Sequence, residues 1–456
     1  MRRLLIAGLI LLGSCSAQHS ASSAPADVPP TEIQKTAIPK TAISASTKKR
    51  FENQIAEFIL RDVQESLPGL QGVTRVQFLR GKSEQFNQSV NNNLLSSRLL
   101  MEKDILDYLL ISEDTLLHSD SYDSTLAALS SLDWKPDTYE HKVLEELNRI
   151  DQKIALLASE TGKDTFNHSV HISQVRKTAL YPDDTFNGRQ NYLDRLSQEM
   201  LNAQANWFDT YNVYNPSELS ILGEEGSARS FLYSAEGLVI NLDQVKDLPA
   251  FELKCLAAFY GFPGLQSFIP HPEGSLRGFL NLPAYTLGWA GYILDEIGIR
   301  DQSNTLDYLY FARLQSSMAL ADLKLHSDRW SLEEAVKYIT EHTPYTAHRI
   351  TLMVRQIQQK PGYYAAAFGG KIRFSELKNR CLAEGRRCQA DFNQQVIDQG
   401  PVPFEVLKRL IFLDPANASD RGRGGAQQIG LKEPSVRLSK TTAFFPTRSS
   451  KHQKSD

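Results

Sequence analysis

The chain has 456 residues, of which 23% are charged and 41% hydrophobic, and its formal net charge is −3. This composition is that of an ordinary soluble globular protein, not of a disordered or a membrane-spanning chain. The near-neutral charge argues against a nucleic-acid partner, which usually requires a basic surplus. Four cysteines are too few for a scaffold built from disulfides.

The first residues have the layout of a secretory signal. Arg2-Arg3 precedes an apolar run over residues 4–12, and this run is far shorter than the ~20 residues that a membrane-spanning helix needs. The run leads into Gly13-Ser14-Cys15, which resembles a bacterial lipobox. That resemblance implies a signal peptide over residues 1–14 and a lipid, such as palmitate, on Cys15.

The residue after the cysteine bears on location. In Gram-negative bacteria an Asp at this position favours retention in the inner membrane, and this chain has Ser16. The lipobox resemblance therefore implies a protein of the cell envelope, anchored to the outer membrane and facing the periplasm. The alternative is an ordinary signal peptide cut after Ala17, which would discard Cys15.

Both ends of the mature chain have the composition of unfolded segments. Residues 15–50 are rich in Ser, Ala, Thr, Pro and Lys and have almost no large apolar side chains, so they cannot bury enough surface to offset the entropy of ordering. They predict a flexible tether. Residues 414–456 predict a disordered basic tail, which either contacts an anionic polymer or lipid headgroups or is simply solvated.

The segment between the two ends predicts a mainly α-helical fold with a small β-hairpin or sheet. Ser331–Glu334 is a capping box that marks a helix start. Two apolar runs within residues 231–242 predict a hairpin. We expect an N-terminal helical part, residues 51–185, and a C-terminal helical part, residues 186–413. Apolar residues recur at helical spacing in three stretches: Phe51, Ile55, Phe58, Ile59 and Val63; Leu99, Leu100, Leu106, Leu109 and Leu110; and Val143, Leu144, Leu147, Ile150, Ile154 and Leu157.

The C-terminal part carries a series of landmarks that resembles a known family. They are Phe259-Tyr260-Gly261-Phe262-Pro263-Gly264-Leu265, Leu287-Gly288-Trp289-Ala290-Gly291-Tyr292, Asp322 to His326 ahead of Trp330-Ser331, Arg355 ahead of Pro361-Gly362, and Phe392-Asn393-Gln394 with Gly400 and Pro403-Phe404. Their order is similar to that of the bacterial domain-of-unknown-function family eight-eight-five. Its members are helical, secreted or lipid-anchored proteins that carry H-E-x-x-P-G-H and are regarded as zinc metallopeptidases. The N-terminal part matches only in being helical.

The positions that carry chemistry in that pattern are replaced in this chain. Zinc hydrolysis needs ligands with lone pairs, usually His, Asp or Glu, and a carboxylate to take a proton from water. The backbone-shaping glycines, prolines and Trp289 of the pattern remain. The replaced positions are Phe259, Leu265 and Asn393 for three His, Tyr260 for the general-base Glu, Leu287 for a later Glu and Ala367 for a Tyr.

The resemblance therefore implies a catalytically inactive relative of a zinc metallopeptidase, with no metal or other cofactor. We expect the former active-site groove, with Trp289, Asp322, His326 and Arg355, to bind a peptide or protein partner. Two other functions stay open. An active hydrolase with relocated residues would bring three of His, Asp and Glu together in the groove, and a structural envelope lipoprotein would have its groove packed shut.

Other candidate groups have less specific patterns. His271 and Glu273, like Asp295 and Glu296, lack the spacing of two ligands one helical turn apart. Asp322 and His326 do have this i, i+4 spacing. They predict either a surviving cleft pair, in which Asp orients His, or an ordinary hydrogen bond on a helix.

Three cysteines follow Cys15 along the chain. Cys381 and Cys388 flank Glu384-Gly385, which predicts a helix end and a turn. An oxidising periplasm favours a disulfide between them, and the alternative is that the two side chains point apart along the helix. Cys255 lies in an apolar run and predicts a buried, unreactive thiol.

Overall fold

The structure is a computed structural model. It describes residues 44–159, 167–211, 219–226, 231–234, 237–268, 275–300, 305–384 and 390–412. The predicted signal peptide, Cys15, most of the tether and the basic tail lie outside these residues. The described residues from Ser46 to Phe412 belong to one compact unit. Among the described helices, none is both long enough and apolar enough to cross a bilayer.

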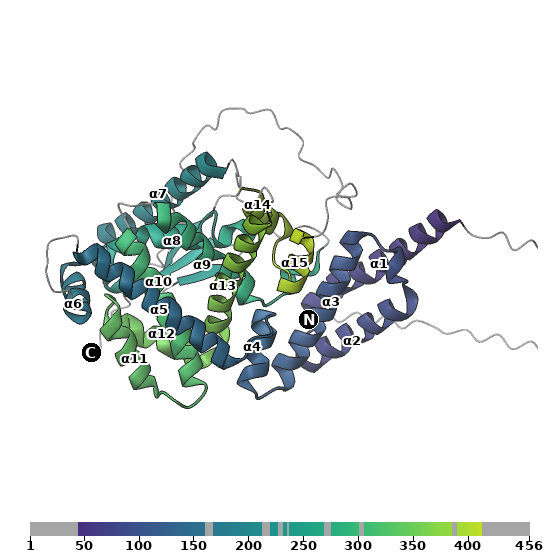
Figure 1. The fold of residues 1–456 in the computed structure, drawn as a ribbon, viewed down its shortest axis with the longest axis horizontal. Coiled ribbons are helices and arrows are strands. Elements are labelled where there is room, and N and C mark those ends of the chain that lie inside the picture. The colour runs from purple at the N-terminus through teal and green to yellow at the C-terminus, as the bar shows by residue number, and fades with distance from the viewer. Residues whose placement is uncertain are drawn as a thin grey trace, which may run out of the picture. The chain divides into compact units, whose positions relative to one another are not determined.

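The fold is mainly helical, as predicted (Figure 1). The first half of the chain contributes α1 (Ala45–Ser66), α2 (Gly72–Ser89), α3 (Ser97–His118), α4 (Tyr122–Ser130), α5 (Pro136–Ser159), α6 (His168–Thr178) and α7 (Phe186–Tyr211). The second half contributes α8 (Leu253–Tyr260), α9 (Pro283–Arg300), α10 (Thr305–Leu325), α11 (Leu332–His342), α12 (Ala347–Gln359), α13 (Tyr363–Ala383), α14 (Ala390–Gln399) and α15 (Phe404–Phe412). Short 3-10 turns include η5 (Leu265–Phe268). The capping box that was predicted at Ser331 begins α11.

Helix α1 begins earlier than expected. Residues 45–50, which the composition assigns to the tether, form its first turns. They are Ala, Ser, Thr, Lys and Arg, and Ala, Lys and Arg are good helix formers even where no side chain is buried. The predicted tether over residues 15–50 is therefore too long at its C-terminal end.

The first predicted apolar face is buried only in part. Ile59 and Val63 of α1 are buried, whereas Phe51 and Phe58 are 61% and 68% exposed. These two phenylalanines are two helical turns apart and lie on one side of the helix. Helix α1 packs through the stripe that contains Ile59 and Val63, so the predicted apolar face is wider than the face that the core covers.

A small three-stranded sheet lies beside the helices. Its strands are β1 (Ile221–Glu224), β2 (Phe231–Ser234) and β3 (Gly237–Asn241), in the order β1-β3-β2. Strand β3 pairs antiparallel with β2, which confirms the predicted hairpin, and parallel with β1, which the sequence does not predict. Because β3 is central, it is buried along its length, and β2 forms one edge of the sheet.

Helices α9, α10 and α13 pack against one another. Two glycines allow α9 and α13 to approach unusually closely. A Cβ atom on Gly370 of α13 would lie 1.7 Å from the carbonyl oxygen of Ala284, and one on Gly288 of α9 would lie 2.8 Å from the backbone of Gly370. Any larger residue at Gly370 would force these two helix backbones apart.

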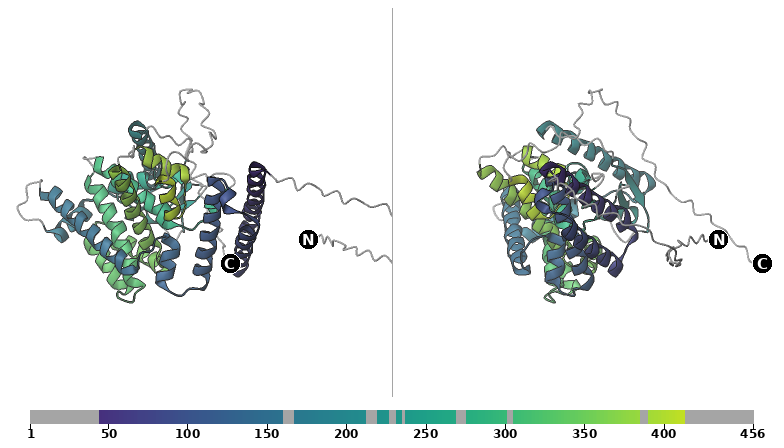
Figure 2. Two further views of the ribbon diagram at one scale, coloured as in Figure 1. Left: turned by 45° about the vertical axis from the view of Figure 1, so that its right-hand side comes forward. Right: turned by 90° about the vertical axis from the view of Figure 1, so that its right-hand side faces the viewer.

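The two predicted helical parts share this packing. Helix α5 lies along α10, and α4 packs against α13 and α9. In Figures 1 and 2 the blue helices of the N-terminal part accordingly lie beside the green helices of the C-terminal part. One hydrophobic cluster accordingly joins residues such as Leu126 and Tyr139 to Trp289 and Phe374. The N-terminal helices therefore support the C-terminal helices that carry the landmark residues.

Candidate functional site

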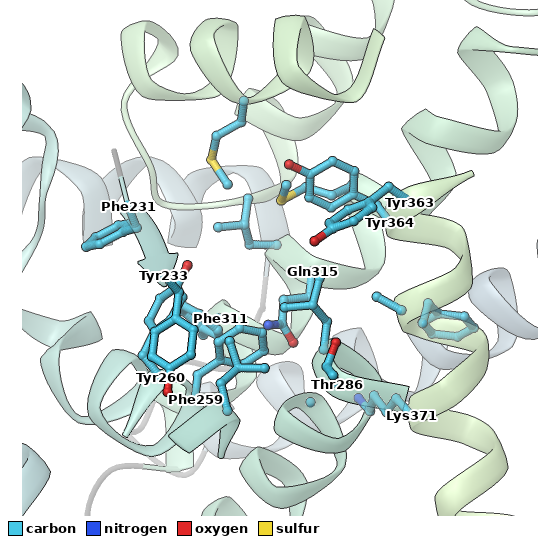
Figure 3. Close-up of a pocket in the computed structure, with 18 of the residues that line it drawn as sticks. Phe231, Tyr233, Phe259, Tyr260, Thr286, Phe311, Gln315, Tyr363, Tyr364 and Lys371 are labelled. Atoms are coloured by element: carbon cyan, nitrogen blue, oxygen red, sulfur yellow. The ribbon is translucent and has the colours of Figure 1, made fainter. Parts of the chain in front are cut away.

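A cavity of about 400 Å³ opens between the edge strand β2 and the helices α8, α9, α10, α12 and α13 (Figure 3). Its lining is predominantly apolar and aromatic. Within the described part of the chain, no His, Cys, Asp or Glu lines it. The aromatic lining residues are Phe231, Tyr233, Phe259, Tyr260, Phe268, Phe311, Tyr363, Tyr364 and Phe368.

One wall of the cavity is a group of contacting rings. Alternate residues of a strand point to the same face, so β2 directs Phe231 and Tyr233 together toward Tyr260 at the end of α8. The ring centroids lie 5.7 Å and 6.0 Å from that of Tyr260. Tyr260 in turn contacts Phe259 at 5.2 Å, and Phe259 contacts Phe311 of α10 at 5.9 Å. Such aromatic pairs are each worth about 0.5–1.5 kcal/mol beyond their buried area.

The opposite side of the cavity is formed by the first turn of α13. Tyr363 and Tyr364 lie there with their hydroxyl groups directed toward the cavity, and Thr286, Gln315 and Lys371 lie at one end (Figure 3). The cavity therefore combines aromatic walls with a small number of polar groups. This is the usual composition of a small-molecule or side-chain pocket.

The landmark positions converge on this cavity. Phe259, Tyr260, Leu265, Leu287 and Ala367 come from α8, η5, α9 and α13, and all five line it. The order of motifs in the sequence thus points to one place in the fold.

Asn393, the sixth replaced position, does not line the cavity. It is fully buried in α14, and its side-chain oxygen accepts a hydrogen bond from the hydroxyl of Tyr292 at 2.9 Å. Because Tyr292 belongs to α9, this bond ties α14 to α9. Asn393 is therefore part of the packing beneath the site and does not line the cavity.

None of the four residues that were expected in the groove lines the cavity. Trp289 is fully buried, and its indole N–H donates to the carbonyl oxygen of Pro263 at 2.8 Å, which fixes the loop after α8. Arg355 is exposed on α12. The arginine of α12 that does line the cavity is Arg349, six positions earlier. Six residues rotate a helix by about 240°, so Arg355 lies on another side of α12.

Asp322 and His326 form the hydrogen bond that their spacing predicts, with 2.9 Å between the carboxylate and Nδ1. Asp322 is fully buried and also accepts from the backbone N–H groups of Gly362, Tyr364 and Ala365, at 2.9, 2.9 and 3.0 Å. Helix α13 has Gly362 as its N-cap and no side-chain cap of its own. Asp322 therefore supplies the cap from α10, and it positions the helix turn that carries Tyr363 and Tyr364.

The charge of Asp322 also acts on His326. Burial alone would lower the pKa of His326, but the hydrogen bond and the negative charge of Asp322 outweigh it and raise the pKa above its usual value. The imidazole ring stacks on Tyr122, whose hydroxyl also donates to Asp322 at 3.3 Å. This cluster is a structural support of the cavity wall.

The two buried cations of the lining form ion pairs with carboxylates that do not line the cavity. Arg349 forms an ion pair of 2.5 Å with the fully buried Glu252. Lys371 forms ion pairs of 2.9 Å with both Glu146 and Asp295. Burial raises the pKa of Glu252 and of Asp295 against the pull of their cationic partners. None of these acids faces the cavity, so they are not placed to act on a ligand there.

Two hydroxyl groups of the lining have no hydrogen-bond partner among the described residues. They belong to Tyr233 and to Ser316, which is only 1% exposed. A buried hydroxyl without a partner costs about 1–3 kcal/mol. Sequence reasoning did not find these residues, because a Tyr in a strand and a Ser in a helix carry no distinguishing pattern.

The residues present do not fit a zinc ion. The family resemblance implies zinc ligands at the positions of Phe259, Leu265 and Leu287 and a general base at that of Tyr260, but the three ligand positions hold hydrocarbon side chains without lone pairs. Burial raises the pKa of the Tyr260 phenol, which disfavours its anionic form. Throughout the described ranges, no three His, Cys, Asp or Glu side chains are grouped so as to hold a metal ion.

The model of a family described as bacterial protein of unknown function (DUF885) matches residues 16–411. The chain belongs to this family. No curated protein is significantly similar to it.

Two solved structures share the fold of this DUF885 protein. A presumed lipoprotein from Colwellia psychrerythraea is 20% identical, with a TM-score of 0.57 over 81% of this chain and 69% of the other. A presumed lipoprotein of unknown function from Shewanella oneidensis is 13% identical, with a TM-score of 0.51 over 81% of this chain and 73% of the other. At these identities the likeness shows the fold alone.

Neither of the two cysteines that the structure describes, Cys255 and Cys381, lines the cavity. Cys255 is buried in α8 and is not in a disulfide, which confirms the prediction of a buried thiol. Helix α13 ends at Ala383, near the predicted turn. Cys381 is disulfide-bonded, but Cys388, like His271 and Glu273, lies outside the described residues. The pairing of Cys381 with Cys388 therefore stays a prediction.

Proposed function

We propose that this DUF885 protein is a catalytically inactive, lipid-anchored envelope protein that binds a peptide or protein partner in the aromatic cavity. One observation carries the proposal. Five positions that hold or support chemistry in the family pattern line one open cavity, yet their side chains are Phe, Tyr, Leu, Leu and Ala. A site of this composition can bind a ligand, but it offers no metal ligand and no carboxylate base.

The cavity also favours binding over the two alternatives. A hydrolase with relocated residues needs His, Asp or Glu in the cavity, and none of its described lining residues is one of these. A purely structural protein would have a closed groove. A volume of about 400 Å³ lies within the range of roughly 300–1,000 Å³ that is typical of ligand pockets.

Binding in the cavity can be tested with a blocking variant. A phage-displayed heptapeptide library is selected on the purified mature protein, and the affinity of the best synthetic peptide is measured by fluorescence anisotropy. Leu287→Trp fills the cavity and should weaken binding about tenfold or more. Arg355→Ala, an exposed site on α12, is the control and should bind like wild type. Equal affinities of wild type and a folded Leu287→Trp protein would reject the cavity as the site.

The membrane anchor rests on different observations. The family match begins at residue 16, directly after Cys15, and the lipobox resemblance puts the lipid on that cysteine. Cys15→Ser should release the protein from membranes into the soluble periplasmic fraction. Ser16→Asp, the matched variant, should stay membrane-bound but move to the inner membrane. A Cys15→Ser protein that still sediments with the outer membrane after high-salt washing contradicts the anchor.

A further inference from the structure

Strand β2 is the free edge of the sheet on the side of the cavity. In the order β1-β3-β2, it has a paired neighbour on one side only among the described residues. Three of its residues, Phe231, Leu232 and Tyr233, line the cavity. An edge strand presents backbone N–H and C=O groups to which another extended chain can pair.

The backbone of β3 determines which groups of β2 face outward. The N–H of Leu238 donates to the carbonyl oxygen of Ser220, at 2.9 Å, on the β1 side of the sheet. Leu238 lies opposite Tyr233, and hydrogen-bonded and non-hydrogen-bonded pairs alternate along an antiparallel ladder. The Leu238–Tyr233 pair is therefore a non-hydrogen-bonded one. The N–H and C=O of Tyr233 point away from β3 to the open edge, and those of Phe231, two residues earlier, do the same.

The side chains at this edge lead into the cavity. Phe231 and Tyr233 are on the same face of β2, and both rings contact Tyr260 in the aromatic wall (Figure 3). Residues of an added strand that lie opposite Phe231 and Tyr233 would project to that same face. Tyr233 and Ser316, whose buried hydroxyl groups have no partner among the described residues, belong to the lining that such residues would meet.

We propose that the partner is an extended peptide segment that adds to β2 as a further strand and inserts an apolar or aromatic side chain into the cavity. This inference rests on the proposed function, because it assigns a binding mode to the same cavity. The lining holds Arg349, Lys360 and Lys371 but no carboxylate in its described part. A Lys or Arg side chain of the peptide would find no acidic partner there, whereas an apolar one is matched by the aromatic walls.

The first test is an N-methyl scan of the heptapeptide selected as described above. One N-methyl group is introduced at each backbone position in turn, and binding to the wild-type protein is measured. A strand paired with β2 directs every second N–H toward β2, so methylation should weaken binding about tenfold or more at alternate positions and about twofold or less between them. A loss that does not alternate, or no loss at any position, would overturn strand addition.

The second test changes β2 itself. Tyr233→Pro removes the outward N–H without removing a bond to β3, and proline is tolerated on an open edge. Tyr233→Val is the matched control, because it loses the same ring and hydroxyl but keeps the N–H. We expect the peptide to bind Tyr233→Pro about tenfold or more weakly than Tyr233→Val. Equal affinities of the two folded variants would overturn strand addition, and if Tyr233→Pro does not fold, the N-methyl scan decides.

The blocking variant separates this inference from the proposed function. If Leu287→Trp abolishes binding while Tyr233→Pro and Tyr233→Val bind alike, the cavity is the site and only strand addition is wrong. If Leu287→Trp binds the peptide like wild type, the cavity is not the site, and the inference fails together with the proposed function.

Discussion

The structure predicts that removing the carboxylate of Asp322 destabilises the wall of the cavity. Asp322→Ala leaves the buried N–H groups of Gly362 and Ala365, and the partly buried N–H of Tyr364, without their acceptor. Each lost partner costs about 1–3 kcal/mol when the donor stays buried, and water that enters the vacated volume recovers part of this. We therefore expect a loss of about 4 kcal/mol in the free energy of unfolding, within the range for breaking a buried charged network.

Urea denaturation with an unchanged m value measures this loss. Tyr122→Phe is the matched control, since it removes only one long bond of 3.3 Å to the same carboxylate and should cost about 0.5–1 kcal/mol. Hydrogen exchange adds a local readout, because the amides of Gly362, Tyr364 and Ala365 should lose protection in Asp322→Ala alone. An Asp322→Ala protein no less stable than Tyr122→Phe, with these amides still protected, would refute the assignment of Asp322 as the cap of α13.

Two further predictions concern stability. The folded-state pKa of His326 is raised, so its contribution to the free energy of unfolding is fully present below its unfolded pKa of about 6.5 and is lost as pH rises through the folded pKa. The difference in the free energy of unfolding between wild type and His326→Asn should therefore be larger at pH 5.5 than at pH 8.5. A difference that grows with pH contradicts this. Gly370→Ala should lose several kcal/mol in the free energy of unfolding or fail to fold, because its Cβ would clash with the α9 backbone. The control is Gly81→Ala, whose Cβ would meet no atom within 4 Å and which should gain up to about 1 kcal/mol. Similar melting temperatures for the two variants would be inconsistent with the close contact of α9 and α13.

The order of landmarks in the sequence led to one cavity of the fold, but it did not predict which other residues line that cavity. That order singled out five positions that all line the cavity: Phe259, Tyr260, Leu265, Leu287 and Ala367. None of the four residues expected in the groove, Trp289, Asp322, His326 and Arg355, lines the cavity, because the position of a landmark along the chain does not say which side of a helix faces the cavity.

Local sequence patterns do not predict the contacts that support the cavity and the small sheet. Asp322 caps a helix whose N-cap residue, Gly362, lies 40 residues later in the chain, and no spacing rule connects two such positions. Strand β1 is short and has no alternation of its own, and it is held by a parallel pairing with β3. The burial of α1 on one stripe depends on which helices surround it. Helical periodicity and capping motifs predict single helices, whereas the packing partners of each helix depend on the whole fold.

The most direct test of the central claim is the zinc content of the purified mature protein, measured by mass spectrometry before and after treatment with a strong chelator and read together with its melting curve. Metal that binds only the native state stabilises it by mass action, and structural zinc contributes on the order of 10 kcal/mol in small zinc peptides. With Phe259, Tyr260, Leu265 and Leu287 at the positions of the ligands and the base, we predict no stoichiometric zinc and a melting temperature that the chelator leaves unchanged. Stoichiometric zinc with a chelator-sensitive melting temperature would contradict the account of an inactive binding site.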